Sequence, residues 1–270
     1  MIHSALPDLL AADEPAAFEV AGREGRSPFV DSPFVVSPFV VACDHAGRDI
    51  PRSLGSLGLS EEVRASHVAW DIGAGGVARR LGAALGAVVV SQRYSRLVID
   101  CNRPLDAPDS IVARSERVVI PGNQNVGQAE ATARARAVFH PYHDAIRAEL
   151  ARRREAGQTS IYVAVHTFTP VYLDVARPWH VGVLYNRDAR LAEPLLGLLR
   201  SEGDLVVGCN EPYAVSDATD FSVVNHGEQR GIPHVELEIR QDLVADDAGQ
   251  IAWAARLARL LVAAAQSISI

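Results

Sequence analysis

Short apolar runs alternate with longer amphipathic segments along most of this 270-residue chain, and this order is what most constrains its fold. The apolar runs, which we predict to be strands, lie at 40–42, 88–91, 97–100, 161–166, 180–184, 205–208 and 234–239. Helices are predicted over 74–85, 128–154, 188–201 and 249–266, with a short helix after Ser60 and a kink at Pro141. Strands separated by helices favour an α/β fold with a mixed, mostly parallel sheet and helices on both faces.

The first 36 residues differ from the rest of the chain because they show no helical or strand periodicity. Ser-Pro-Phe-Val occurs at 27–30, a variant follows at 31–36, and a third copy at 37–40 leads into the first strand. We therefore predict an N-terminal arm with an insertion over 1–36 and a single domain over 37–270. With 48% hydrophobic residues, such a domain can form a core without disulfides.

Composition and charge limit the possible partners and compartment. The net charge is −7 and no block of Lys and Arg alternates with aromatics, so a nucleic-acid partner is not expected. No apolar run has the length of a membrane span, and the acidic start does not resemble a signal peptide. Three widely spaced cysteines indicate reduced thiols. We expect a cytoplasmic protein that acts on a small molecule; its oligomeric state stays open.

Two histidines occupy the same position at the ends of predicted strands. His45 follows 40–42, and His166 ends 161–166. In open α/β sheets the carboxyl ends of strands form the ligand crevice, so neighbouring strands would bring these imidazoles together. Two imidazoles and one carboxylate form an open three-ligand zinc site. The carboxylate candidates are Asp71, Asp44 and Asp49, and their spacing does not decide among them.

A second group of polar residues follows the run at 97–100. Asn102 and Arg103 stand beside Asp100, and an arginine fork can bind a carboxylate through two hydrogen bonds. A structural Asp–Arg pair is the alternative. In the last predicted strand, Glu236 and Glu238 alternate with apolar residues, and a carboxylate beside a metal-bound water is the expected general base. The alternative there is a solvated face of an edge strand.

These and other strings together resemble the N-formylglutamate amidohydrolase family, within the wider zinc carboxypeptidase and aspartoacylase-like group. The resemblance spans about 36–262 and depends on the order of many short strings. They are His-x-Gly-x-x-Ile-Pro at 45–51, Trp-Asp-Ile-Gly at 70–73, Ser-Arg-Leu-Val-Ile-Asp-Cys-Asn-Arg-Pro at 95–104, Pro-Tyr-His at 141–143, His-Thr-Phe-Thr-Pro at 166–170, Arg-Pro-Trp at 177–179, Asn-Glu-Pro-Tyr at 210–213 and Glu-Ile-Arg-Gln-Asp-Leu at 238–243.

The resemblance implies a phosphorylase/hydrolase-like fold, one zinc ion and an amidohydrolase acting on an N-formyl or short N-acyl amino acid, expected to be acidic. The wider group uses His-x-x-Glu as its first ligand pair, whereas Arg48 stands here three residues after the histidine. The resemblance therefore favours His45, Asp71 and His166 as metal ligands.

The same resemblance implies roles for the remaining polar residues. Glu238 is the expected base, with Glu236 as its alternative, and Arg96 the expected oxyanion stabiliser. Asn102 and Arg103 would bind the α-carboxylate, and His226 and Arg240 are further candidates for substrate contact. His143 is expected to be structural.

Two other functions fit the same sequence features. A metallo-carboxypeptidase or peptidoglycan-type amidase would use the same centre on a peptide end. A non-catalytic binder of an acidic metabolite would keep the pocket without the chemistry, although none of the expected catalytic residues is missing.

Overall fold

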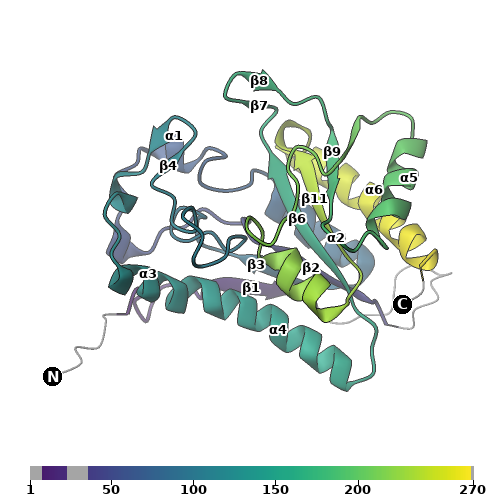
Figure 1. Ribbon diagram of the computed structural model, residues 1–270, viewed down its shortest axis with the longest axis horizontal. Coiled ribbons are helices and arrows are strands. Elements are labelled where there is room, and N and C mark those ends of the chain that lie inside the picture. The colour runs from purple at the N-terminus through teal and green to yellow at the C-terminus, as the bar shows by residue number, and fades with distance from the viewer. Residues whose placement is uncertain (1–7, 23–35, 269–270) are drawn as a thin grey trace.

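The computed structural model describes residues 8–22 and 36–268, and its centre is a seven-stranded sheet (Figure 1). In order across the sheet, the strands are β1 (Phe18–Ala21), β3 (Val88–Gln92), β2 (Phe39–Cys43), β6 (Ile161–Phe168), β11 (His234–Arg240), β9 (Val181–Leu184) and β10 (Val207–Cys209). The four strands from β3 to β11 are parallel, β1 is antiparallel at one edge, and the parallel pair β9–β10 is antiparallel to β11. The predicted mixed, mostly parallel sheet is confirmed.

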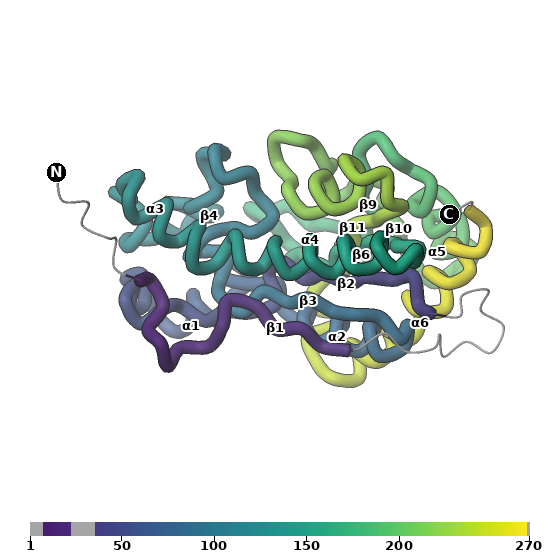
Figure 2. The backbone as a smooth tube through the Cα atoms, turned by 90° about the horizontal axis from the view of Figure 1, so that it is seen from below, coloured from purple at the N-terminus to yellow at the C-terminus, as the bar shows by residue number. Residues whose placement is uncertain are grey.

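Helices cover both faces of this sheet, as predicted. They are α1 (Glu61–Arg64), α2 (Ala74–Leu85), α3 (Gln128–Arg134), α4 (His140–Glu155), α5 (Ala192–Ser201) and α6 (Asp247–Gln266). Helices α2, α5 and α6 lie on one face and the long α4 on the other (Figures 1 and 2). Two small hairpins stand apart from the sheet: β4 (Arg114–Ser115) with β5 (Val118–Val119), and β7 (Val171–Tyr172) with β8 (Val175–Ala176).

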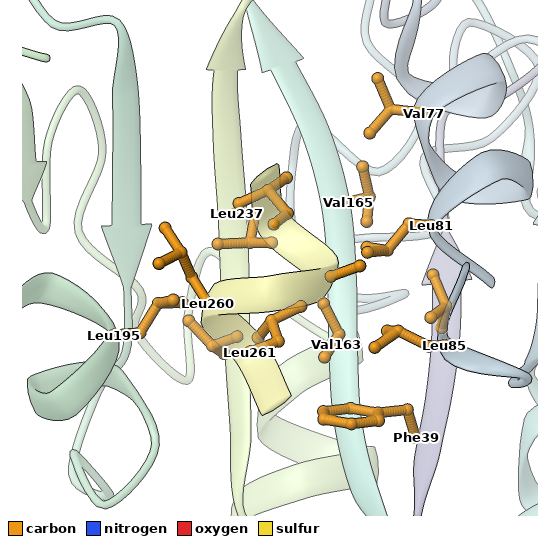
Figure 3. Packing of buried hydrophobic residues seen from close by; sticks show 14 of the residues in the cluster. Phe39, Val77, Leu81, Leu85, Val163, Val165, Leu195, Leu237, Leu260 and Leu261 are labelled. Carbon is orange, nitrogen blue, oxygen red and sulfur yellow. The ribbon is translucent and has the colours of Figure 1, made fainter. Parts of the chain in front are cut away.

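Alternation along the central strands forms two separate cores. In β6, Val163 and Val165 face α2 and α6, where they pack among leucines such as Leu81 and Leu261 (Figure 3). Tyr162 and Ala164, which alternate with these valines, belong to the second cluster, under α4. Because side chains alternate between the two faces of a strand, a strand covered on both sides reads as one continuous apolar run.

Two predicted elements differ in the structure. Residues 97–100, predicted as a strand, form a buried turn instead, because a short apolar run does not distinguish a strand from another buried segment. The helix predicted over 128–154 contains a π-helical turn, Ala135–Phe139, immediately before α4. The irregularity expected as a kink at Pro141 is therefore found in this turn, a few residues earlier. Pro141 has no backbone N–H and cannot donate the regular helical hydrogen bond to the preceding turn.

The described part of the N-terminal arm contributes the edge strand β1, which the sequence did not predict. The copy of Ser-Pro-Phe-Val at 27–30 lies outside the described residues, as does the variant at 31–36 except for its last residue, and the third copy leads into β2. The domain boundary at residue 36 stays a prediction. None of the helices within 8–22 and 36–268 combines the length and apolar character needed to span a membrane.

Candidate metal centre and cleft

Two histidines from neighbouring strands meet at the carboxyl edge of the sheet. His45 lies two residues beyond the end of β2, and His166 lies near the end of β6. The two strands are parallel, with Ala42 opposite Ala164, so their ends reach the same edge. The Nδ1 atoms of the two buried histidines are 3.2 Å apart. The structure therefore brings the two predicted imidazoles together.

A carboxylate completes this cluster. Asp71 lies in the turn before α2, where its backbone N–H donates to the carbonyl oxygen of His45 at 3.0 Å. Its Oδ2 is 3.4 Å from His45 Nδ1 and 3.0 Å from His166 Nδ1. Of the other candidates, Asp44 contacts the opposite nitrogen of His166, and Asp49 is exposed. Three ligand-type atoms, all within 4.8 Å of one another, therefore face one point.

The far nitrogen of each histidine contacts a second carboxylate. Nε2 of His45 is 2.7 Å from Asp100 Oδ1, and Nε2 of His166 is 3.0 Å from Asp44 Oδ2. Burial favours a higher pKa for both carboxyl groups, but the hydrogen bonds and charges of the histidines hold the pKa of each below its usual value. Because an ionised carboxylate only accepts, each imidazole that gives up one proton to bind a metal would keep the other on Nε2, which leaves a lone pair on Nδ1.

This donor set fits a small cation. Two imidazole lone pairs and a carboxylate oxygen, separated by 3.0–3.4 Å, repel one another unless a positive charge lies between them. Neighbouring ligands of a tetrahedral zinc ion, with bonds of about 2.0–2.1 Å, are about 3.3–3.4 Å apart. The side chains of His45, Asp71 and His166 could therefore hold a metal ion and leave a fourth position open.

Arg96 spans two carboxylates of the cluster. Its guanidinium donates to Asp71 Oδ1 at 3.2 Å and to Asp100 Oδ2 at 2.9 Å. Burial favours a lower pKa for Arg96, but the charges of these two aspartates raise it above its usual value. Arg96 thus fixes the positions of Asp71 and Asp100, the two carboxylates that contact His45. Its own side chain is 25% exposed and lines the cleft.

The part of the chain that forms this cluster also identifies its family. Residues 37–245 match the family model described as N-formylglutamate amidohydrolase. The chain belongs to the N-formylglutamate amidohydrolase family. The match covers the strands of the sheet from β2 to β11 and all three residues of the cluster. No protein with a curated description matches the chain.

Two solved structures are similar along nearly the whole chain. A gene product from Agrobacterium tumefaciens is 36% identical, with a TM-score of 0.88, and the alignment covers 96% of this chain and 98% of that one. An N-formylglutamate amidohydrolase from Ralstonia eutropha is 19% identical, with a TM-score of 0.65 and coverage of 94% and 98%. The second similarity shows a shared fold.

In this amidohydrolase-family chain, a cleft of about 460 Å³ opens in front of the cluster. Its buried part contains the three clustered residues and two glutamates of β11, and its exposed part includes residues of the β4–β5 and β7–β8 hairpins. Arg117 and Asp174, one from the turn of each hairpin, form an exposed ion pair at 2.5 Å. The cleft is therefore bordered by two hairpins that touch each other.

The two glutamates lie on the same side of the sheet as His166. In the parallel register of β6 and β11, Glu238 is opposite His166 and Glu236 is opposite Ala164. Burial raises the pKa of each glutamate to about 8, and the nearby His166 opposes that rise. Since β11 lies between β6 and β9, the alternative of a solvated edge strand is wrong.

These glutamates differ in their hydrogen bonds. Glu236 Oε2 accepts from the side-chain amide of Asn102 at 3.3 Å. Glu238 Oε2 is buried and has no hydrogen-bond partner within the described part of the chain. A buried oxygen without a partner is costly in a finished core, so Glu238 has the oxygen that is better placed to accept a proton from a bound water.

Asn102 and Arg103 line the cleft, but the fold already uses much of their bonding capacity. The Oδ1 atom of Asn102 accepts from the backbone N–H groups at 221–222. Arg103 donates from Nε to Asp109 at 2.9 Å and from one terminal nitrogen to the carbonyl oxygen of Thr219 at 2.5 Å. The expected Asp–Arg pair thus involves Asp109, and the guanidinium retains donors that are not used by these bonds.

Two other predicted contact residues lie away from the residues that line the cleft. His226 is fully buried, where its Nε2 is 2.9 Å from Nδ1 of His143. His143 in turn bonds the carbonyl oxygen of Cys101 at 2.8 Å, in keeping with its expected structural role. Arg240 pairs with Asp242 at 2.8 Å outside the cleft. Neither His226 nor Arg240 is placed to touch a molecule in the cleft.

Several residues around the cluster have roles that the sequence interpretation did not assign. Asp44, considered there only as a metal ligand, and Asp100 orient the histidines, and the hydroxyl of Ser222 donates to Asp44 Oδ1. Tyr213 lines the cleft and is 43% exposed. Asp44 adjoins His45 in the chain, and this adjacency was the one available signal for its role.

Proposed function

We propose that this protein is a metal-dependent amidohydrolase that cleaves an N-formyl or other short N-acyl amino acid, with zinc held by His45, Asp71 and His166. The observation that carries the proposal is the convergence of two Nδ1 lone pairs and one carboxylate oxygen in the cleft of a chain of this family. A bound zinc ion supplies a Lewis acid that polarises the acyl oxygen and acidifies a water molecule.

Glu238 is the proposed base. It lies opposite His166 in the register of the sheet and has a buried carboxylate oxygen without a partner among the described residues. In the reaction it accepts the proton of the attacking water and passes that proton to the leaving amine nitrogen, as a general base and then a general acid. Its raised pKa suits the second step, because a weakly acidic carboxyl group holds the proton until the amine leaves.

Arg96 and Arg103 are the proposed substrate-facing donors, and Asn102 is the residue proposed to position the backbone beside them. Arg96 is already fixed by Asp71 and Asp100, so it can stabilise a developing oxyanion without reorganising. Arg103 is assigned to the α-carboxylate of the substrate through the donors that remain free, with Asn102 holding the neighbouring backbone. The placement of His226 and Arg240 gives them no part in this scheme.

The test combines metal analysis with a substrate panel. The purified protein is assayed for bound metal and then with N-formyl and N-acetyl amino acids, each as the free acid and as the α-amide. We expect one zinc per chain, hydrolysis of free acids and none of the α-amides. Equal rates on both forms would remove the carboxylate-binding role from Arg103, and hydrolysis of peptide ends instead would favour the carboxypeptidase alternative.

A further inference from the structure

Most positive side chains around the cleft are paired with carboxylates. Arg96 contacts two aspartates, Arg103 pairs with Asp109 at 2.9 Å, and His67 lies 2.6 Å from Glu116. A charge that is already paired has less to gain from a substrate carboxylate. A guanidinium group near the cleft that lacks such a partner is therefore better suited to bind a second substrate carboxylate.

Two arginines meet that condition. Within 8–22 and 36–268, neither Arg114 nor Arg177 has a carboxylate at ion-pair distance. Arg114 lines the cleft from β4 as an exposed side chain. Arg177 follows β8, where its backbone N–H donates to the carbonyl oxygen of Pro170 at 2.8 Å and closes the base of the β7–β8 hairpin.

Aromatic side chains of the cleft hold Arg177 in place. Its guanidinium carbon is 4.5 Å from the ring centre of Tyr172 and 4.8 Å from that of Tyr213, and Phe168 is 5.9 Å away. One terminal nitrogen also donates to the hydroxyl of Tyr213 at 2.8 Å. All three aromatic residues line the cleft. Stacking and this single hydrogen bond fix the guanidinium while leaving most of its five N–H donors unused.

Arg177 adjoins the cleft that holds the proposed catalytic residues. The rings of Phe168, Tyr172 and Tyr213 that surround its guanidinium line the same cleft as Glu238 and the metal-ligand cluster. Phe168 follows His166 by two residues on β6, so Arg177 lies near the place where the amide bond would lie. A substrate bound there can extend its side chain toward the aromatic cradle of Tyr172 and Tyr213.

We propose that Arg177 is the specificity-determining residue that binds the side-chain carboxylate of an acidic N-acyl amino acid. This inference deepens the proposed function and depends on it for the position of the amide. A planar guanidinium already oriented by two tyrosines offers a bidentate contact to a carboxylate with little further loss of conformational freedom. Within the described part of the chain, Arg114 has no aromatic or hydrogen-bonding partner, so nothing there orients its charge.

The test uses binding as well as turnover. Glutarate and its monoamide glutaramate, which keeps only one of the two carboxylates, are titrated calorimetrically into zinc-loaded protein, and hydrolysis is measured on N-formylglutamate and N-formylglutamine. The wild type should prefer the dicarboxylate in both assays. Arg177→Met should reduce that preference by about 10- to 100-fold, since it removes a charged hydrogen-bonding partner. Arg177→Lys should give an intermediate preference, and Arg114→Met should leave it unchanged.

Three results would overturn the inference: equal affinity of the wild type for glutarate and glutaramate, an equal loss for both compounds in Arg177→Met, or loss of the preference in Arg114→Met. Thermal unfolding of each variant checks that it is folded, and Arg177→Lys keeps the test informative if Arg177→Met is not. Preferential binding of glutarate without any hydrolysis would refute the proposed function and keep the inference. Hydrolysis without a preference for the dicarboxylate would keep the proposed function and refute the inference.

Discussion

The Nδ1 atoms of His45 and His166 face each other at 3.2 Å although the residues are 121 positions apart. Each ring is turned by a carboxylate behind it, Asp100 for His45 and Asp44 for His166. The parallel pairing of β2 with β6 brings the two side chains close together, and the carboxylates orient the rings so that the Nδ1 atoms face each other.

Zinc content should depend on the carboxylate of Asp71. Asp71→Asn is expected to lower zinc occupancy after dialysis against a mild chelator, because a neutral amide binds zinc more weakly than a carboxylate does. His140→Gln, which changes an exposed histidine of α4, serves as the control and should keep full occupancy. Metal analysis by atomic absorption gives the result, and unchanged occupancy in Asp71→Asn would exclude that residue as a ligand.

Removing the carboxylates behind the histidines should weaken metal binding without touching the ligands. An asparagine at position 44 can donate to Nε2 of His166, which would shift the ring proton to Nδ1 and remove the lone pair. We expect Asp44→Asn to reduce zinc affinity by about 10- to 100-fold in a competition titration. Asp204→Asn, an exposed residue paired with Arg256, should have no effect. Equal affinities in the two variants would contradict the assigned tautomer.

Replacement of Glu238 and replacement of Glu236 should have different effects on kcat. Glu238→Gln is expected to keep zinc and fold while kcat falls by about 100-fold or more, since general acid–base catalysis is lost. Glu236→Gln should cost less, because Glu236 is occupied by Asn102. If the larger fall in kcat belongs to Glu236→Gln, the two roles are exchanged. A change confined to KM in Glu238→Gln would assign Glu238 to substrate binding.

The buried ring of His143 should destabilise the fold as the pH drops below neutral. Burial lowers the pKa of His143 to about 4, so the folded protein keeps this ring neutral while the unfolded chain takes up a proton near pH 6.5. The contribution of His143 to folding stability is therefore complete above about pH 6.5 and is lost toward pH 4, by about 2 kcal/mol between pH 8 and pH 5. Urea unfolding of the wild type and His143→Gln at both pH values measures the difference. The variant should lose less stability than the wild type on acidification, and equal losses would contradict the prediction.

A glycine in the first motif should not tolerate a methyl group. A Cβ added at Gly47 would lie 1.8 Å from the carbonyl oxygen of Arg93, so the turn after His45 would have to move. Gly47→Ala is expected to destabilise the fold by about 1–3 kcal/mol, as overpacking does. Gly197, in α5 with no atom within 4 Å of an added Cβ, is the matched control, and its replacement by Ala should be neutral or slightly stabilising. Thermal or urea unfolding compares the two.

The sequence was sufficient for features that depend on chain order and periodicity. The parallel centre of the sheet followed from strands separated by helices, and the meeting of His45 with His166 from their common position at strand ends. It was not sufficient where long-range contacts decide. Asp71, Asp44 and Asp49 have the same chemistry, and the turn before α2 places Asp71 beside both imidazoles. The strand predicted at 97–100 was wrong for a similar reason. The segment is apolar because it is buried, and a short buried turn and a short buried strand have the same apolar sequence pattern.

The antiparallel strand β9 has a consequence for how this protein can change. β6 ends at the cleft, and because β9 is antiparallel to β11, β9 begins at that same edge. The connection over 169–180, which carries the β7–β8 hairpin and Arg177, therefore starts and finishes beside the cleft. The proposed specificity residue thus lies on a connection between strands, whereas His166 and Glu238 lie on the strands themselves. A change in that connection would alter the proposed side-chain contact and leave the backbone positions of His166 and Glu238 to the pairing of β6 with β11.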